Sequence, residues 1–200
     1  MTADGRADAV VFTAGDGAWY VAKANPYGTG FEAYSQWQIG HGAGSNDQML
    51  ADTSGDLRAD AVAFWLDSGS WLVAKAKTSN DGFGPATTWI TGHGVGSDHR
   101  FLARVDTGLT ADAVIFINGD GSWHVAKSNG STFNTPPPWL YGHGAGSDNQ
   151  ILSDGSGDSR ADAIGYWGDT GSWIVATAKP TDNGFNPPGP AWIAGHGIGS

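Results

Sequence analysis

The stretch ADAVAFWLDSGSWLVAKA, residues 59–76, joins two apolar runs through a short segment of Asp, Ser and Gly. In the second run Trp71 and Val73 share one face of an extended chain, while Leu72 and Ala74 share the other. Both faces are therefore apolar or small, which is typical of a strand in a sheet that neighbouring sheets cover on both sides. The joining segment has the composition of a turn.

The same stretch occurs four times, and this repetition organises the chain. The tryptophan near the start of the second run recurs at spacings of 52, 52 and 50 residues, at Trp19, Trp71, Trp123 and Trp173. A GHG triplet recurs with its histidine at spacings of 52, 50 and 53 residues, at His41, His93, His143 and His196. A period of about fifty residues predicts one domain of four repeats. Their approximate bounds are 1–50, 51–102, 103–152 and 153–200.

Each repeat contains short runs that predict strands, with Gly, Asp or Pro in the connections. QMLAD (48–52), ADAVAF (59–64), SWLVAKA (70–76) and the run before the second GHG triplet give four in one period. Four short strands per fifty residues predict an all-β protein, a β-propeller of four-stranded blades. The first repeat starts after the position of QMLAD, so we expect its blade to lack one strand. A β-trefoil would need three units, and a β-helix shorter rungs.

Charge and composition exclude several classes of partner. The chain has 20 acidic and 10 basic residues, a formal net charge of -10, and no cluster of basic residues. We therefore expect neither nucleic acid nor membrane insertion. The N-terminal segment lacks the pattern of a signal peptide. Because there is no cysteine, the redox compartment stays open.

An Asp-rich turn precedes the ADAV run and predicts a cation site in two repeats. Oxygen-bearing side chains stand at positions 1, 3, 5 and 9 of a loop, and alternate residues of such a loop can point to one hard cation. The predicted structural Ca²⁺ ligands are Asp52, Ser54, Asp56 and Asp60 in the second repeat, and Asp154, Ser156, Asp158 and Asp162 in the fourth. The third loop departs from the pattern, with Arg104 and Gly108 at positions 1 and 5. The alternative is that these side chains accept from turn amides and pair with the neighbouring arginine.

These motifs resemble a known type of repeat. ADTSGDLRADAVAF (51–64) is similar to FG-GAP or VCBS-type β-propeller repeats, and GDGSWHVAKSNGSTF (119–133) is similar to the blades of Psathyrella velutina-type propeller lectins. The resemblance implies a propeller found in secreted or extracellular proteins, with calcium in the Asp-rich loops. It also implies that glycans, including N-acetylated sugars, are the ligands.

The GHGxGS loops are the candidate ligand sites. They lie where the chain crosses to the next blade, where glycine lets a ligand approach the backbone. The predicted polar contacts are His41, Ser45, Asn46, His93, Ser97, Asp98, His143, Ser147, Asp148 and His196. A second set of indoles, at Trp37, Trp89, Trp139 and Trp192, either stacks on a sugar face or belongs to the core. The alternative for the histidines is that each bonds a backbone carbonyl and fixes the crossover.

No motif of a hydrolase, metalloprotease or thiol enzyme occurs, so we expect no enzyme.

The sequence leaves two candidate functions. The first is a multivalent lectin-like propeller with structural calcium; the second is a non-catalytic structural or protein-interaction propeller, a fragment or a scaffold of a larger ring. Because one strand is missing from the first blade, an open sheet edge favours association. We expect a homo-oligomer in which two chains close an eight-bladed ring, with a four-bladed monomer as the alternative.

Overall fold

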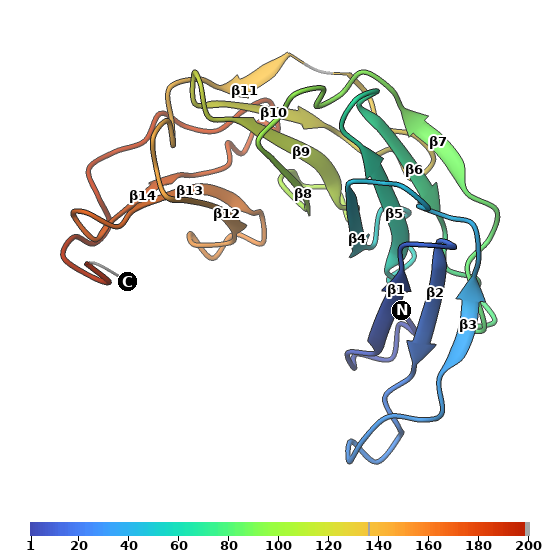
Figure 1. The fold of residues 1–200 in the computed structure, drawn as a ribbon. Helices are drawn as coiled ribbons and strands as arrows, with labels where there is room; N and C mark the ends of the chain where they lie inside the picture. Colours follow the sequence, from blue (N-terminus) through green and yellow to red (C-terminus); the bar gives the residue numbers. More distant parts are fainter. Residues whose placement is uncertain (136, 199–200) are drawn as a thin grey trace. The chain divides into compact units, whose positions relative to one another are not determined.

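The computed structural model describes residues 1–135 and 137–198. Within these ranges the regular structure consists of strands, and we find no helix of the length and apolarity that a membrane crossing needs. The strands form four antiparallel sheets in chain order, one per sequence repeat (Figure 1). The predicted all-β class and the four propeller-type sheets are confirmed.

The chain divides into two compact units, and the first holds two sheets. It comprises Met1–Val95 together with Ser128–Phe133. Its three-stranded sheet contains β1 (Ala9–Thr13), β2 (Ala18–Ala22) and β3 (Ser35–Gln38). Its four-stranded sheet contains β4 (Asp47–Ala51), β5 (Asp60–Trp65), β6 (Ser70–Ala74) and β7 (Thr87–Ile90). The first sheet lacks the strand that β4 supplies to the second, as the sequence predicted.

The second unit comprises Gly96–Lys127 and Asn134–Ser200. Its four-stranded sheet contains β8 (His99–Ala103), β9 (Asp112–Ile117), β10 (Ser122–Ala126) and β11 (Pro138–Leu140). Its other sheet contains β12 (Asn149–Ser153), β13 (Asp162–Trp167) and β14 (Ser172–Ala176). The fourth strand expected there is reduced to one isolated bridge, Trp173–Ile193.

The core of each sheet is an aromatic pair from its hairpin. In the second sheet Phe64 on β5 lies opposite Trp71 on β6, with ring centroids 5.0 Å apart, and both side chains are fully buried. Phe116 and Trp123 form the same pair on β9 and β10, at 4.9 Å. In the turn that joins β5 and β6, Gly69 has φ +59°, and a Cβ there would lie 2.8 Å from the backbone of Gly92. Glycine is therefore required for the GHG segment to pack on the hairpin.

A buried aspartate joins the strands of each hairpin to the Asp-rich turn. Asp60 is fully buried at the start of β5, and its Oδ1 accepts from the Ala76 amide at 2.9 Å. Its Oδ2 accepts from the amide and the hydroxyl of Thr53, at 3.1 and 2.7 Å. Burial raises the pKa of this carboxyl above its ordinary value, because desolvation disfavours the charged form. The ADAV aspartate is thus a structural residue in the second repeat.

Candidate functional site

The GHG histidines of the first and third repeats are buried. His41 and His143 are 3% and 2% exposed. His41 Nε2 donates to the carbonyl of Ala61 on β5 at 3.0 Å, and His143 Nε2 donates to the carbonyl of Ala163 on β13 at 2.9 Å. Each ring therefore fixes the crossover to the next sheet. Burial lowers the pKa of both imidazoles, because the charged form loses its hydration.

The backbone of these triplets is held by the core indole of the same repeat. Three Nε1 groups each donate to a histidine carbonyl oxygen at 2.9 Å, in the pairs Trp19–His41, Trp71–His93 and Trp123–His143. His93 is also buried, with 8% exposed. This geometry corresponds to the crossover-fixing role that the sequence left as the alternative. A sugar could reach the ring of His41 or His143 only if the imidazole left its carbonyl partner.

The fourth triplet has a different environment. His196 is exposed. Trp173 Nε1 is buried without a hydrogen-bond partner, whereas its three counterparts are paired. The backbone of the triplet thus accepts a hydrogen bond from the core indole in three repeats, and the indole of the fourth repeat does not make this bond. The final residues of this copy, Gly199 and Ser200, lie outside the described residues.

The predicted serines support the crossover loop. Ser45 Oγ donates to the Gly42 carbonyl at 2.7 Å, and Ser147 Oγ donates to the Gly144 carbonyl at the same distance. A glutamine amide donates to each hydroxyl, from Gln48 at 2.8 Å and from Gln150 at 2.7 Å. Ser97 is 4% exposed. These hydroxyls therefore act within the loop rather than on its surface.

The residue that follows each serine caps the next hairpin turn. One side-chain oxygen accepts from a backbone amide in three pairs: Asn46 with Leu66 at 2.7 Å, Asp98 with Asn118 at 2.6 Å and Asp148 with Gly168 at 2.6 Å. All three side chains are nevertheless exposed. Of the predicted polar contacts in the first three loops, these are the side chains that a solute can reach.

The second set of tryptophans is mostly core. Trp37, Trp89 and Trp139 are 4%, 5% and 6% exposed. Trp37 packs edge-on against Phe83 at 5.3 Å, which is a packing role and leaves no indole face for a sugar. Trp192 is the exception, because 53% of it is exposed. The sugar-stacking alternative therefore has structural support only at Trp192.

The Asp-rich loop of the second repeat is closed by amide donors. The Asp52 carboxylate accepts from the amides of Gly55, Asp56 and Leu57 at 2.7, 3.2 and 2.7 Å. Asp56 accepts from the Arg58 amide at 2.9 Å and pairs with its guanidinium at 3.5 Å. Asp60, the predicted ligand at position 9, is committed to Thr53 and Ala76, as described above. Ser54 Oγ donates to Asp52 Oδ1 at 3.4 Å, so the fourth predicted ligand is also engaged within the loop.

The fourth repeat has the same arrangement. Asp154 accepts from the amides of Gly157, Asp158 and Ser159, and Asp158 pairs with Arg160. Across residues 1–135 and 137–198, no group of three or more His, Cys, Asp or Glu side chains is placed to hold a metal. The carboxylates of both loops are thus engaged by backbone amides and arginines. Calcium at these loops therefore stays a prediction.

A pocket of about 580 Å³ lies beside the third GHG loop. Its lining includes Asp148 before β12, Asn149 on β12, Trp167 at the end of β13, and Asp169 in the following turn. The carboxylates of Asp148 and Asp169 and the amide of Asn149 are exposed, and Trp167 is half-buried. The Trp167 indole lies over Gly165, where a Cβ would be 2.8 Å from the ring. Two carboxylates, an amide and an indole thus border one cavity.

Only Asp148 of this group was predicted from sequence. Asn149 on β12, Trp167 on β13 and Asp169 in the following turn were not among the predicted site residues. The available signal was the pairing of Trp with Asp two residues later, Trp65–Asp67 and Trp167–Asp169, in the second and fourth repeats. The turn between the two hairpin strands carries this pair toward the crossover loop.

No protein-family model matches the chain, and no curated protein matches it. Among solved structures, an Agrocybe aegerita lectin is similar, with a TM-score of 0.76 and 25% sequence identity over 94% of this chain. That lectin specifically recognises non-reducing terminal N-acetylglucosamine. This chain spans 49% of the lectin's length. The similarity supports a lectin-like β-propeller fold, while the FG-GAP or VCBS resemblance stays a prediction.

Proposed function

We propose that the chain is a carbohydrate-binding, lectin-like protein whose ligands are terminal sugars, including N-acetylated ones. The observation that carries this proposal is the likeness to the Agrocybe aegerita lectin over nearly the whole chain. Because the chain covers about half of that lectin, the sugar specificity belongs to the proposal and is not transferred with the fold.

The pocket beside the third GHG loop has the chemistry that sugar binding needs. The exposed carboxylates of Asp148 and Asp169 can accept hydrogen bonds from sugar hydroxyls, and the Asn149 amide can both donate and accept. Trp167 offers apolar ring surface for the C–H face of a sugar. A few polar groups that converge over an aromatic side chain are typical of small-ligand sites.

A second site of similar composition is proposed in the second repeat. Asn46, Trp65 and Asp67 occupy the positions of Asp148, Trp167 and Asp169. Asn46 is exposed and caps the turn through Leu66, as Asp148 does through Gly168. Two weak sites on one chain would raise retention on a glycan surface by multivalency.

Retention of the chain on immobilised N-acetylglucosamine-terminated glycans tests the proposal. We expect Trp167→Ala and Asp169→Ala each to weaken retention about fivefold, since each removes a contact worth about 1 kcal/mol. Asp81→Ala is the matched control, because Asp81 is an exposed aspartate that does not line this pocket. Full retention of both pocket variants would remove the pocket from the proposal. Absence of parent retention on any glycan would remove sugar binding itself.

A structural or protein-interaction role is the second candidate, because apolar side chains are exposed at both the first and the fourth repeat. Phe31 is 59% exposed and Trp192 is 53% exposed. Glycan retention and self-association are separate measurements, so either function can fail without the other.

A further inference from the structure

Within the first unit, the first and second repeats meet through a defined set of contacts. Phe83, from the second repeat, packs against Trp19 and Trp37 of the first, with ring centroids 6.1 and 5.3 Å apart. His41 Nε2 donates to the carbonyl of Ala61 at 3.0 Å. At this junction one repeat contributes two indoles and an imidazole, which we call the presenting half. The next repeat contributes a phenylalanine and an alanine carbonyl, which we call the receiving half.

The second unit repeats this junction with different residues of the same types. Phe185, from the fourth repeat, packs against Trp123 and Trp139 of the third, at 6.3 and 5.3 Å. His143 Nε2 donates to the Ala163 carbonyl at 2.9 Å. The two receiving phenylalanines, Phe83 and Phe185, are 2% and 1% exposed. The junction is therefore a reproducible interface between repeats.

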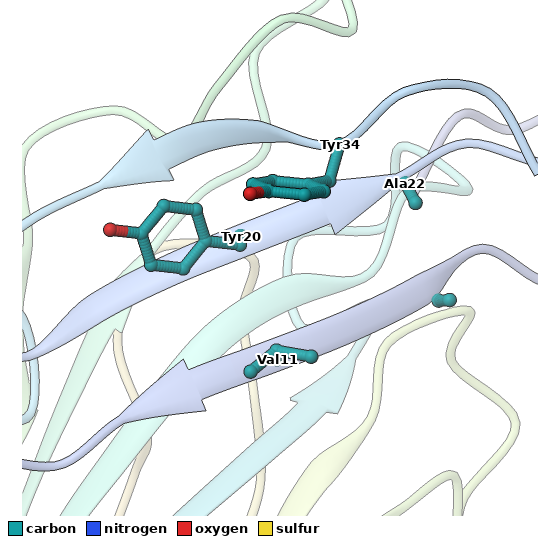
Figure 2. Close-up of a pocket in the computed structure, with 5 residues that line it drawn as sticks. Val11, Tyr20, Ala22 and Tyr34 are labelled. Atoms are coloured by element: carbon teal, nitrogen blue, oxygen red, sulfur yellow. The ribbon is translucent and has the colours of Figure 1, made fainter.

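The first repeat carries the receiving half without a partner. Phe31 occupies the position of Phe83 and Phe185, yet 59% of it is exposed. The sheet face beside it forms a pocket of about 400 Å³, lined by Ala9, Val11, Tyr20, Ala22 and Tyr34. Figure 2 shows Val11, Tyr20, Ala22 and Tyr34 gathered over the same side of β1 and β2. We call Phe31 and these five residues the first-repeat face.

In the second repeat the corresponding face is closed. Ala61, Ala63 and Ala74 stand at the positions of Ala9, Val11 and Ala22, and all three are fully buried. Val11, by contrast, is 60% exposed. The pocket is thus the space that a preceding repeat fills elsewhere in the chain.

The fourth repeat carries the presenting half without a partner. Trp173, Trp192 and His196 occupy the positions of Trp19, Trp37 and His41, and we call them the fourth-repeat face. Trp192 and Ile193 are 53% and 49% exposed, and His196 is exposed as well. The two faces are the two halves of one interface, and neither is covered in the structure.

We propose that the first-repeat face of one chain binds the fourth-repeat face of a second copy of the same chain. Phe31 would pack between Trp173 and Trp192 of the other copy, and His196 would donate to the Ala9 carbonyl. A second copy fits because it supplies the residue types that the interior junctions use. This chain spans 49% of the similar lectin's length, so two chains together have about the length of that lectin.

Light scattering on size-separated protein tests the proposal. We expect the parent chain to form a species of two chains, and a concentration-independent mass of 20.7 kDa would overturn the proposal. Phe31→Asp and Trp192→Asp each place a charge on one face, and both are expected to give the single-chain mass. Because both positions are exposed in the single chain, neither variant should unfold it; circular dichroism checks this. Leu109→Asp, at an exposed leucine outside both faces, is the matched control and should keep the parent mass.

Mixing the two variants distinguishes head-to-tail binding from other modes. Phe31→Asp retains a sound fourth-repeat face, and Trp192→Asp retains a sound first-repeat face. An equimolar mixture can therefore form one intact junction, so we expect a two-chain species that neither variant forms alone. A mixture that stays at the single-chain mass, or parent mass in either variant alone, would overturn the assignment of the faces.

Discussion

The first and the last GHG triplets contrast within one chain. His41 is 3% exposed, stacks against Trp19 with centroids 5.8 Å apart, and donates to the Ala61 carbonyl on the next sheet. His196 has the same sequence neighbours and is exposed. The motif alone does not decide whether its histidine is a structural residue or a surface group. The presence of a following sheet decides it.

Phenylalanine shows the same contrast at the opposite side of the repeat. Phe185 is 1% exposed between two indoles, whereas Phe31 is 59% exposed at the equivalent position. A repeat protein of this kind derives its stability from contacts between neighbouring repeats. A repeat face that no neighbouring repeat covers is therefore less stabilised, and its exposed apolar side chains favour association. Substitutions at equivalent positions can measure how much each junction contributes.

The largest expected effect is at the phenylalanines. Phe185→Ala should lower the free energy of unfolding by about 3–5 kcal/mol, because it leaves a cavity between Trp123 and Trp139. Phe31→Ala, measured at a dilution where the protein is a single chain, should change it by less than about 0.5 kcal/mol. Urea unfolding followed by tryptophan fluorescence gives both values. Equal losses at the two positions would contradict the contrast between covered and uncovered repeats.

The repeat period and the strand runs were predictable from sequence, because spacing and alternation depend on local residue types. The missing strand of the first blade was also predictable from where the first repeat starts. The candidate ligand site was less predictable from sequence than the fold. Whether His41 or Trp37 faces solvent depends on the neighbouring sheet, which no short motif encodes, and the pocket at Trp167 depends on a turn that brings it to Asp148. Equivalent residues of the repeats therefore predict the fold more readily than they predict the function.

The second prediction concerns pH and the buried imidazoles. Burial lowers the pKa of His143 in the folded chain, while the unfolded chain keeps a value of about 6.5. Below about pH 6.5 the unfolded state binds more protons, so stability is greatest above this pH and falls as the pH drops toward the folded pKa. His143→Gln should flatten this fall by up to about 1.4 kcal/mol per pH unit, because glutamine can still donate to the Ala163 carbonyl but does not titrate.

Urea unfolding at several pH values between 5.5 and 8 measures the effect. His196→Gln is the matched control, since it makes the same substitution at the exposed copy of this histidine. The buried carboxyl of Asp60, whose pKa is raised, contributes equally to parent and variants and cancels in the difference. A parent whose stability does not change across this range, or an equal change in His196→Gln, would contradict a buried neutral His143.

Calcium is expected to have the smallest effect. The sequence predicts it at Asp52 and Asp154, yet both carboxylates already accept from three amides, and Asp56 and Asp158 are paired with arginines. A cation would have to displace the arginines, so we expect a dissociation constant of about 1 mM, typical of weak extracellular sites. At 2 mM calcium this gives about 0.6 kcal/mol per loop and a rise in Tm of about 2 °C.

The third repeat supplies an internal reference for this effect, because its loop lacks two of the four ligands. Arg104 and Gly108 replace the aspartates at positions 1 and 5, yet β9 still forms and Asp112 is fully buried. A loop of this kind thus folds without the calcium ligand set. Asp56→Asn combined with Asp158→Asn removes two charges and keeps amide acceptors, so it should abolish the calcium-dependent rise in Tm. If EDTA and calcium leave the parent Tm equal, the amides alone close these loops and the calcium prediction fails; if the rise persists in the double variant, the cation binds elsewhere.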